Sequence, residues 1–316
     1  MNIYQQILQQ TNGIYALSPM EDVTDTVFRQ ILCDIGKPDL FFTEFMNTDG
    51  YMSEGRNRVI HRLKFTEKER PIVFQLWGNN PQNYANTVKD IVKLKPDGID
   101  INLGCSVKKV LQHDSCSALI KNPQLVEEII DAVKRESGNI PVSVKTRLGY
   151  DKIITDEWFN FLLKQNLDLI IVHGRIARDG YTQPSNWEEI ARVVKLRDEI
   201  SPTTVILGNG DIKDLEMADK YISKYGVDGV MIGRAVMQNP WLFSRRDEIG
   251  REERLNTLEQ HLQLFQSVWK GEKPFYTQKK YIKMYVSNFS GADKLRMKFM
   301  GCRDVNEALD IIREII

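Results

Sequence analysis

The stretch PIVFQLWGNNPQNYANTVKDIVKLKPDGIDINLGC, residues 71–105, contains one complete unit of the repeat on which the fold is built. Its first eight residues form an apolar run with the composition of a buried strand. Asn80 and Pro81 suit the start of a helix, and Val88 and Ile91 then recur at helical spacing. The last eight residues form a second apolar run. Strand, helix and strand in succession imply parallel pairing, because the chain must cross back over the sheet before the next strand begins.

The same alternation continues through most of the chain. The predicted strands lie in residues 13–20, 40–45, 71–78, 98–105, 141–149, 167–175, 203–211 and 228–235. Eight such units over about 240 residues match the size of a (β/α)₈ TIM barrel. A doubly wound open sheet is the alternative, and the periodicity alone does not separate the two.

The residues at the carboxyl ends of these runs favour the closed barrel. Nearly every run ends in a polar or backbone-permissive residue, and in a barrel those ends form one ring around one site. On an open sheet they would be spread along an edge. The ring residues are Pro19, Met20, Glu44, Gln75, Asn102, Lys145, His173, Asn209, Gly210, Asp211, Gly233 and Arg234.

After Trp241 the strand signals stop and only helical patterns follow. We therefore predict a barrel domain over residues 1–245 and a small all-helical domain over residues 250–316. Between Lys270 and Arg303 nine basic side chains face two acidic ones, a net charge of +7, with tyrosines interleaved. A solvated helix face is the ordinary explanation of such a run. The excess of one sign together with the aromatic residues favours a surface that contacts a nucleic-acid backbone.

Composition excludes several other classes. The 316 residues carry 43 basic and 43 acidic side chains, so the total charge gives no attraction to nucleic acid or membrane. No apolar run approaches the ~20 residues that a membrane span needs, and the first residues lack the pattern of a secretory signal. Four scattered cysteines without a C-x-x-C pair indicate neither a disulfide framework nor a metal site. We expect a cytoplasmic protein.

The ring also carries chemical signals. Glycines follow the last two predicted strands together with Arg234, at the place where barrels commonly bind phosphate, although a lone glycine is usually a turn residue. Lys145 would be costly to bury without a partner, which is either a structural salt bridge or an electron-rich cofactor atom such as the edge of a reduced flavin. Gln75 offers a donor and an acceptor for a ring edge. His173 is either a core histidine or a donor to the phosphate or ring.

Seven segments together resemble the tRNA-dihydrouridine synthases, in their order and rough spacing. They are LSPMEDVTD, VFQLWG, INLGCSVKKV, VKTRLG, VHGR, LGNGDI and VMIGRAVMQNPWLF. The resemblance covers the whole barrel, and the helical tail is similar to the RNA-binding bundle of that family. It implies an FMN-dependent enzyme that reduces the C5–C6 bond of selected uridines in tRNA, with NADPH as the reductant.

The resemblance also implies roles for individual residues. Asn102 would bond the uracil, and Cys105 would be the general acid. The residues against the flavin ring would be Pro19, Met20 and Glu21, with Gln75 and Lys145 at its polar edge. The residues around the ribityl phosphate would be His173, Asn209, Gly210, Asp211, Gly233 and Arg234.

The Cys105 role follows a simple proton balance. Hydride addition at C6 leaves negative charge that a proton at C5 must quench, and a thiol with a pKa near about 8.5 is mostly protonated at neutral pH. Asn102 would orient the base, and Lys108 and Lys109 would steady the anion or a neighbouring phosphate.

The sequence departs from the family pattern in the segment that follows Cys105. Ser106 stands where the family has proline, and residues 113–118, HDSCSA, replace a glycine-rich stretch. Both changes should alter how the Cys105 loop bends and stiffens. We interpret Cys116 within this stretch as structural.

Two other functions fit parts of the sequence. An FMN barrel acting on a free pyrimidine, as in dihydroorotate or dihydropyrimidine dehydrogenases, would use the cysteine as a base, but it would not need the basic helical tail. An RNA-binding protein with an inactive barrel would not need Lys145, Cys105 and the residues of the phosphate end.

Overall fold

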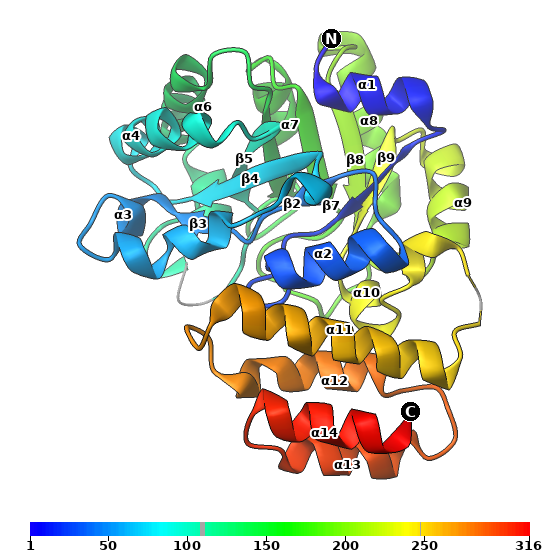
Figure 1. The fold of residues 1–316 in the computed structure, drawn as a ribbon. Coiled ribbons are helices and arrows are strands. Elements are labelled where there is room, and N and C mark those ends of the chain that lie inside the picture. Colours follow the sequence, from blue (N-terminus) through cyan, green and yellow to red (C-terminus); the bar gives the residue numbers. More distant parts are fainter. Residues whose placement is uncertain (108–110, 247) are drawn as a thin grey trace.

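The computed structural model describes residues 1–107, 111–246 and 248–316, and it shows a parallel barrel with a helical region packed against one side (Figure 1). The strands are β1 (Ile14–Leu17), β2 (Phe41–Phe42), β3 (Met46–Asn47), β4 (Ile72–Trp77), β5 (Gly98–Leu103), β6 (Val142–Arg147), β7 (Leu169–His173), β8 (Val205–Asn209) and β9 (Gly229–Ile232). They pair in the order β1-β9-β8-β7-β6-β5-β4-β2, and β3 pairs with the end of β4.

Every ladder of the sheet is parallel, and the ring closes between its first and last strands. The seam is a parallel bridge between Ala16 and Leu40, supported by a hydrogen bond of 3.0 Å from the Leu17 amide to the Leu40 carbonyl. The predicted barrel is therefore confirmed, and the open sheet is excluded.

Helices cover the outside of the barrel. They are α2 (Thr26–Ile35), α3 (Thr48–Tyr51), α4 (Pro81–Ile91), α6 (Pro123–Ser137), α7 (Thr155–Leu163), α8 (Trp187–Ile200), α9 (Leu215–Tyr225) and α10 (Arg234–Gln238). Short 3₁₀ turns lie at η1 (Arg56–Arg58), η2 (Ile60–Leu63), η3 (Glu67–Glu69), η4 (Val92–Leu94), η5 (Cys116–Lys121) and η6 (Leu242–Ser244). At the start of α4 the Asn80 side chain accepts the amides of Gln82 and Asn83, and Pro81 occupies the first turn, as predicted.

An unpredicted helix, α1 (Ile3–Gln10), closes the end of the barrel opposite the ring. Its Tyr4 is buried in the same apolar cluster as the inward-facing residues of the strands. A Cβ at Gly98 would lie 2.5 Å from the Tyr4 hydroxyl, so this strand must begin with glycine. Asn2 caps α1 and donates to Asp168 at 2.8 Å. The amino-terminal end of the barrel is thereby filled, and only the carboxyl end is open for a site.

The helical region consists of α11 (Arg251–Trp269), η7 (Phe275–Gln278), α12 (Lys279–Tyr285), α13 (Ala292–Gly301) and α14 (Val305–Ile315). Helix α11 lies alongside α2 (Figure 1). Leu258 and Leu262 of α11 belong to the same buried cluster as Phe28 of α2, and His261 is buried with its ring 4.3 Å from that of Tyr281. The helical region therefore shares a continuous apolar core with the outside of the barrel.

Within the described residues no helix is long and apolar enough to cross a membrane.

Candidate active site

A cavity of about 830 Å³ opens at the carboxyl ends of the barrel strands. Thirteen of the residues to which the sequence assigned a catalytic, cofactor or substrate role line it. They are Pro19, Met20, Glu21, Gln75, Asn102, Cys105, Lys145, His173, Asn209, Gly210, Asp211, Gly233 and Arg234. One ring residue does not: Glu44 is buried behind the turn that follows β1, where it accepts the Asp22 amide at 2.6 Å.

A chain of side-chain hydrogen bonds fixes the two amides in the cavity wall. Gln75 donates to Asp100 at 2.7 Å and accepts from Asn102 at 3.0 Å. The side-chain oxygen of Asn102, Oδ1, in turn accepts the backbone amides of Gly104 and Cys105, both at 3.0 Å. Asn102 thus holds the turn that carries Cys105, a role that the sequence analysis did not foresee.

Asp100 anchors this chain and was also missed by the sequence analysis, because it lies inside a strand. It is fully buried and accepts the Ser143 hydroxyl at 2.6 Å. Burial raises the pKa of Asp100 to about 6, although the bonds from Ser143 and Gln75 oppose the rise. At neutral pH the carboxylate form of Asp100 accepts both bonds. This fixes which group donates and which accepts along the series of hydrogen bonds from Asp100 through Gln75 to Asn102.

Lys145 reaches the cavity without a carboxylate partner among the described residues. Its ammonium donates to the Asn209 side-chain oxygen at 3.1 Å, and no ion pair within 4.0 Å involves it. Burial, followed by repulsion from Arg147, lowers the pKa of Lys145 to about 8. The structural salt bridge considered from the sequence is therefore not formed, and the lysine presents its charge to the cavity.

The end of the cavity predicted to bind a phosphate is organised by an arginine that the sequence analysis did not single out. The buried Arg175 binds both carboxylate oxygens of Asp211, at 2.7 and 2.6 Å, and its Nη1 lies 3.1 Å from His173 Nε2. Arg234 reaches the same carboxylate at 3.0 Å. Asp211 thus pairs with two arginines. Its role toward a phosphate would therefore be indirect, by holding the arginines in position. Arg175 belongs to the VHGR motif, in which the sequence analysis assigned a role to His173 alone.

The backbone at this end is also specialised. Gly210 has φ of +124°, and a Cβ there would lie 2.1 Å from the Ser185 hydroxyl oxygen, so no other residue fits. Asp211 follows with φ of +58° and accepts the Ser185 amide at 2.9 Å. The His173 pKa is lowered well below its usual value by burial and then by the neighbouring Lys145 and Arg147. His173 is therefore neutral at physiological pH.

Cys105 is held through its backbone, while its thiol interacts with a second cysteine. Its carbonyl accepts both the hydroxyl of Ser117, at 2.7 Å, and the Ser117 amide, at 3.2 Å. A hydrogen bond with the Cys116 thiol lowers the pKa of Cys105 to about 7, against the opposing effect of burial. The contact with Cys116 therefore lowers the Cys105 pKa below the ordinary thiol value that the sequence analysis used.

The structure shows what Ser106 and Cys116, which belong to the two departures from the family pattern, contact. Ser106 accepts a hydrogen bond from Arg147 at 3.3 Å, and Arg147 also donates to the Gly104 carbonyl at 2.7 Å and to that of Gly180 at 3.2 Å. Arg147, another residue missed in the sequence, thus joins the Cys105 turn to the loop after β7. Cys116 is buried, as expected of a structural cysteine, but it also contacts Cys105. Lys108 and Lys109 lie outside the described residues.

The charge of the cavity wall is positive. Its basic residues are Lys145, Arg147, Lys213 and Arg234, and its acidic residues are Glu21 and Asp211. An anionic ligand is therefore favoured. Among the described residues no group of three or more His, Cys, Asp or Glu side chains is placed to hold a metal ion.

Comparison with known proteins agrees with this geometry. The family model for dihydrouridine synthase matches residues 16–316. The chain is 40% identical over 297 residues to a probable tRNA-dihydrouridine synthase 2 of Bacillus subtilis, covering 93% of this chain and 91% of that protein. It is also 40% identical over 306 residues to a probable tRNA-dihydrouridine synthase of Staphylococcus aureus, covering 95% and 92%.

Among solved structures, morphinone reductase superposes with a TM-score of 0.51 at 12% identity, covering 73% of this chain and 84% of that one, which is a likeness of fold alone. The family model and the two relatives span nearly the whole chain, including the helical region. The chain belongs to the dihydrouridine synthase family.

Proposed function

We propose that this protein is a tRNA-dihydrouridine synthase that holds FMN in the barrel and uses NADPH to reduce the C5–C6 bond of selected uridines. The observation that carries the proposal is the meeting of Cys105 and Lys145 at one cavity that is also lined by Arg234 and by Asp211, whose carboxylate is held by Arg234 and by Arg175 behind it. A proton donor, a buried cation and an anion-binding end are the groups that a flavin-dependent reduction of an activated double bond requires.

The residues of the cavity fit FMN in size and charge. The cavity of about 830 Å³ lies within the range of small-molecule sites. Pro19, Met20 and Glu21 would lie against the flavin ring, and Lys145 would face its polar edge. The residues around the phosphate would be His173, Asn209, Gly210, Asp211, Gly233 and Arg234, and Arg175 would act behind them. When bound and reduced, FMN would supply the hydride for C6 of the uridine.

The protein's own contribution to the reaction is a positioned proton. Cys105 would donate its thiol proton to C5, and Asn102 would keep the Cys105 turn in place through the two backbone amides that it accepts. The second Nδ2–H of Asn102 would remain available to bond the uracil, as the family resemblance implies. Lys145 would be mostly protonated below its pKa of about 8, so it would stabilise negative charge at the flavin edge.

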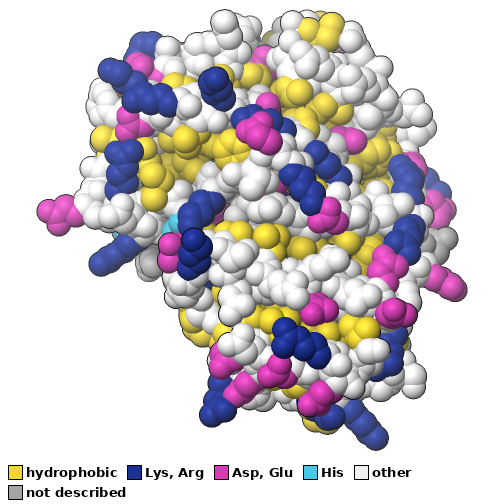
Figure 2. Space-filling model, viewed as in Figure 1, with side chains coloured by type: hydrophobic (Ala, Val, Ile, Leu, Met, Phe, Trp, Pro, Cys, Tyr) yellow, Lys and Arg dark blue, Asp and Glu magenta, His cyan; other side chains and the backbone are white. Residues whose placement is uncertain are grey.

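The tRNA would contact the helical region, and there the structure narrows the candidate surface. Lys279 donates to the Met300 carbonyl, Lys273 pairs with Asp25 and Arg296 donates to the Val286 carbonyl. Figure 2 shows acidic and basic side chains interspersed over the helical region on the face that it presents. Among the described residues, the exposed lysines without a recorded bond in the +7 stretch are Lys270, Lys283, Lys294 and Lys298, and these would meet phosphates. We retain the division into a barrel of residues 1–245 and a helical tRNA-binding region of residues 250–316.

The cofactor can be tested first. The purified protein should be yellow, and heat should release FMN. Release of FAD, or failure to bind any flavin after supplementation, would overturn the cofactor assignment.

The substrate can be tested with NADPH and two classes of acceptor. Transfer RNA that lacks dihydrouridine should gain it, as read by mass spectrometry of the digested nucleosides. Uracil and orotate should leave the flavin reduced. Rapid reoxidation by a free pyrimidine with no reaction on tRNA would favour the dehydrogenase alternative.

A further inference from the structure

The turn between β1 and α2, residues 18–25, forms one wall of the cavity. Ser18, Pro19, Met20 and Glu21 line the cavity from this turn. The turn is closed internally at Met20, whose carbonyl accepts the amides of the residues three and four positions later, both at 3.0 Å. The position of the cavity wall therefore depends on what fixes the outer side of the turn.

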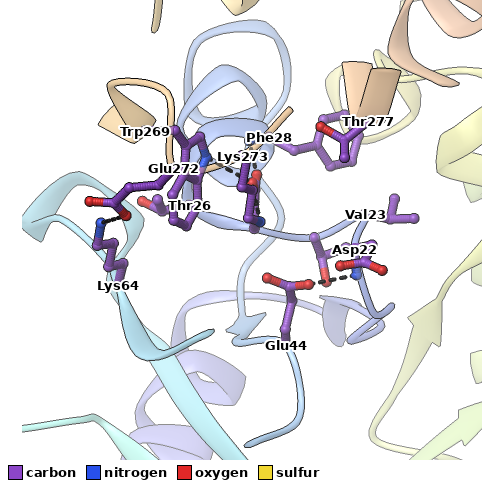
Figure 3. A network of polar contacts seen from close by, with 12 residues as sticks. Asp22, Val23, Thr26, Phe28, Glu44, Lys64, Trp269, Glu272, Lys273 and Thr277 are labelled. Atoms are coloured by element: carbon purple, nitrogen blue, oxygen red, sulfur yellow. Dashed lines mark hydrogen bonds and ion pairs between the residues drawn. The ribbon is translucent and has the colours of Figure 1, made fainter. Parts of the chain in front are cut away.

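The outer side contains a backbone conformation that needs support. Asp22 has φ of +58°, a left-handed value that a residue other than glycine adopts only where its surroundings hold it. Its amide donates to the buried Glu44 carboxylate at 2.6 Å, a bond drawn in Figure 3. The barrel thus holds the amide of Asp22, while the carbonyl points the other way.

The helical region holds the remaining groups of the turn. The Lys280 ammonium donates to the Asp22 carbonyl, and the buried Tyr281 hydroxyl donates to the Val23 carbonyl. At the end of the turn, Trp269 and Lys273 both donate to the Asp25 carboxylate at 3.1 Å, and Figure 3 shows these two residues reaching the start of α2. Four side chains from 250–316 thus bind a single turn of the barrel.

We propose that Lys280 and Tyr281 of α12 are positioning residues for the cofactor site, because they fix the turn that carries Pro19, Met20 and Glu21. The helical region then completes the flavin wall in addition to facing the RNA. The cofactor part of this inference rests on the proposed function. Lys280, counted from the sequence among the basic residues of an RNA surface, is assigned here to the contact between the helical region and the barrel.

Two conservative pairs of variants in the full-length protein test the inference. Lys280→Met removes the bond to Asp22 and keeps the aliphatic stem, and Lys283→Met on the exposed side of the same helix is its control. Tyr281→Phe removes only the hydroxyl, and Tyr285→Phe is its control, because the Tyr285 hydroxyl lies 3.0 Å from His261 Nδ1 and away from the turn.

Amide hydrogen exchange of Val23 and Thr24 should be faster in Lys280→Met and Tyr281→Phe by roughly three- to tenfold, the effect of one lost hydrogen bond. Both control variants should exchange like the wild type. Unchanged exchange in Lys280→Met and Tyr281→Phe would overturn the inference. This readout needs no flavin, so it remains decisive even if the proposed cofactor is wrong.

Release of FMN from the diluted holoprotein, followed by the rise in flavin fluorescence, should be faster by a similar factor in the same two variants. Faster exchange with unchanged flavin release would contradict the cofactor part of the proposal. Weaker tRNA binding with unchanged exchange and release would make Lys280 a phosphate contact and would also contradict it.

Discussion

The two ends of the cavity are held in different ways. At the end proposed to bind the FMN phosphate, Arg175 and Arg234 share the Asp211 carboxylate, and the backbone turns at Gly210, where a Cβ would lie 2.1 Å from the Ser185 hydroxyl oxygen. At the other end no ion pair among the described residues holds the Cys105 turn: the Asn102 side-chain oxygen accepts the Cys105 amide, the Ser117 hydroxyl donates to the Cys105 carbonyl, and the Arg147 guanidinium donates to the Gly104 carbonyl.

This difference matches two separate tasks. Binding a phosphate requires charges that do not change with pH. Arginines provide such charges, and here they are held in place by the Asp211 carboxylate. Donating a proton requires a group whose pKa is close to the working pH, and the Cys105 thiol has a pKa of about 7. Substitutions at one end should therefore affect cofactor binding, and substitutions at the other end should affect turnover.

The largest effect should follow from Cys105→Ala. Formation of dihydrouridine should fall by roughly 10²–10⁴-fold, the usual contribution of a positioned acid. The protein should retain its flavin, because Cys105 is not among the residues proposed to hold FMN. Mass spectrometry of tRNA after incubation with NADPH measures the loss, and near-normal turnover would refute the proton-donor role.

Arg175→Met should have the opposite effect to Cys105→Ala, because it should weaken cofactor binding and leave the proton donor in place. The substitution removes a pair of charge-assisted bonds to Asp211, so FMN affinity should fall by about 10–100-fold. Equilibrium titration with FMN measures the change. Arg192→Met on the outside of α8 is the control, because that half-exposed arginine pairs only with surface carboxylates. Equal losses in the two variants would mean that Arg175 has no special role.

The pH dependence should sharpen the assignment of the acid. A donor with a pKa of about 7 is protonated below pH 7 and ionised above it, so the rate should fall about tenfold per pH unit above that value. Cys116→Ala removes the hydrogen bond that lowers the Cys105 pKa, so the decline should move to higher pH. Cys116→Ser, which keeps a hydrogen-bond donor, should move it less. A pH profile that none of these substitutions shifts would contradict the pairing.

The smallest effect should come from the helical region. Changing Lys283, Lys294 and Lys298 to alanine should weaken tRNA binding and reduce the log–log salt slope by up to about one unit per lost phosphate contact. The rate at saturating tRNA should stay unchanged, because these exposed lysines are not among the cavity-lining residues. A salt slope equal to that of the wild type would mean that these lysines are exposed to solvent and do not contact phosphates.

The sequence predicted the barrel and the ring of strand-end residues from local pattern, whereas Glu21 and the role of Cys105 came from the family resemblance. Alternating strands and helices set the topology, and the residue at the end of each strand must face the same opening. Helix α1 was missed because it precedes the first strand and belongs to no repeat. The bonds of Arg147 and Arg175 were missed because their partners come from other strands and loops.

The basic residues of the helical region also show that a sequence does not reveal which side chains are bound to other parts of the protein. Lys273 and Lys280 counted as surface charge in the sequence, but they bind Asp25 and Asp22 of the barrel. The pKa of Cys105 was likewise invisible, since Cys116 lies eleven residues away and approaches it only through the fold. Composition can count charges and thiols, but three-dimensional contacts decide which of them are available.

The division between the two ends is tested most directly by following the flavin colour of Cys105→Ala through both halves of the catalytic cycle. Reduction of the bound flavin by NADPH should proceed at the wild-type rate, because the cysteine has no part in it. Reoxidation by tRNA lacking dihydrouridine should be slower by roughly 10²–10⁴-fold. Equal slowing of the two halves, or wild-type reoxidation by tRNA, would contradict the account.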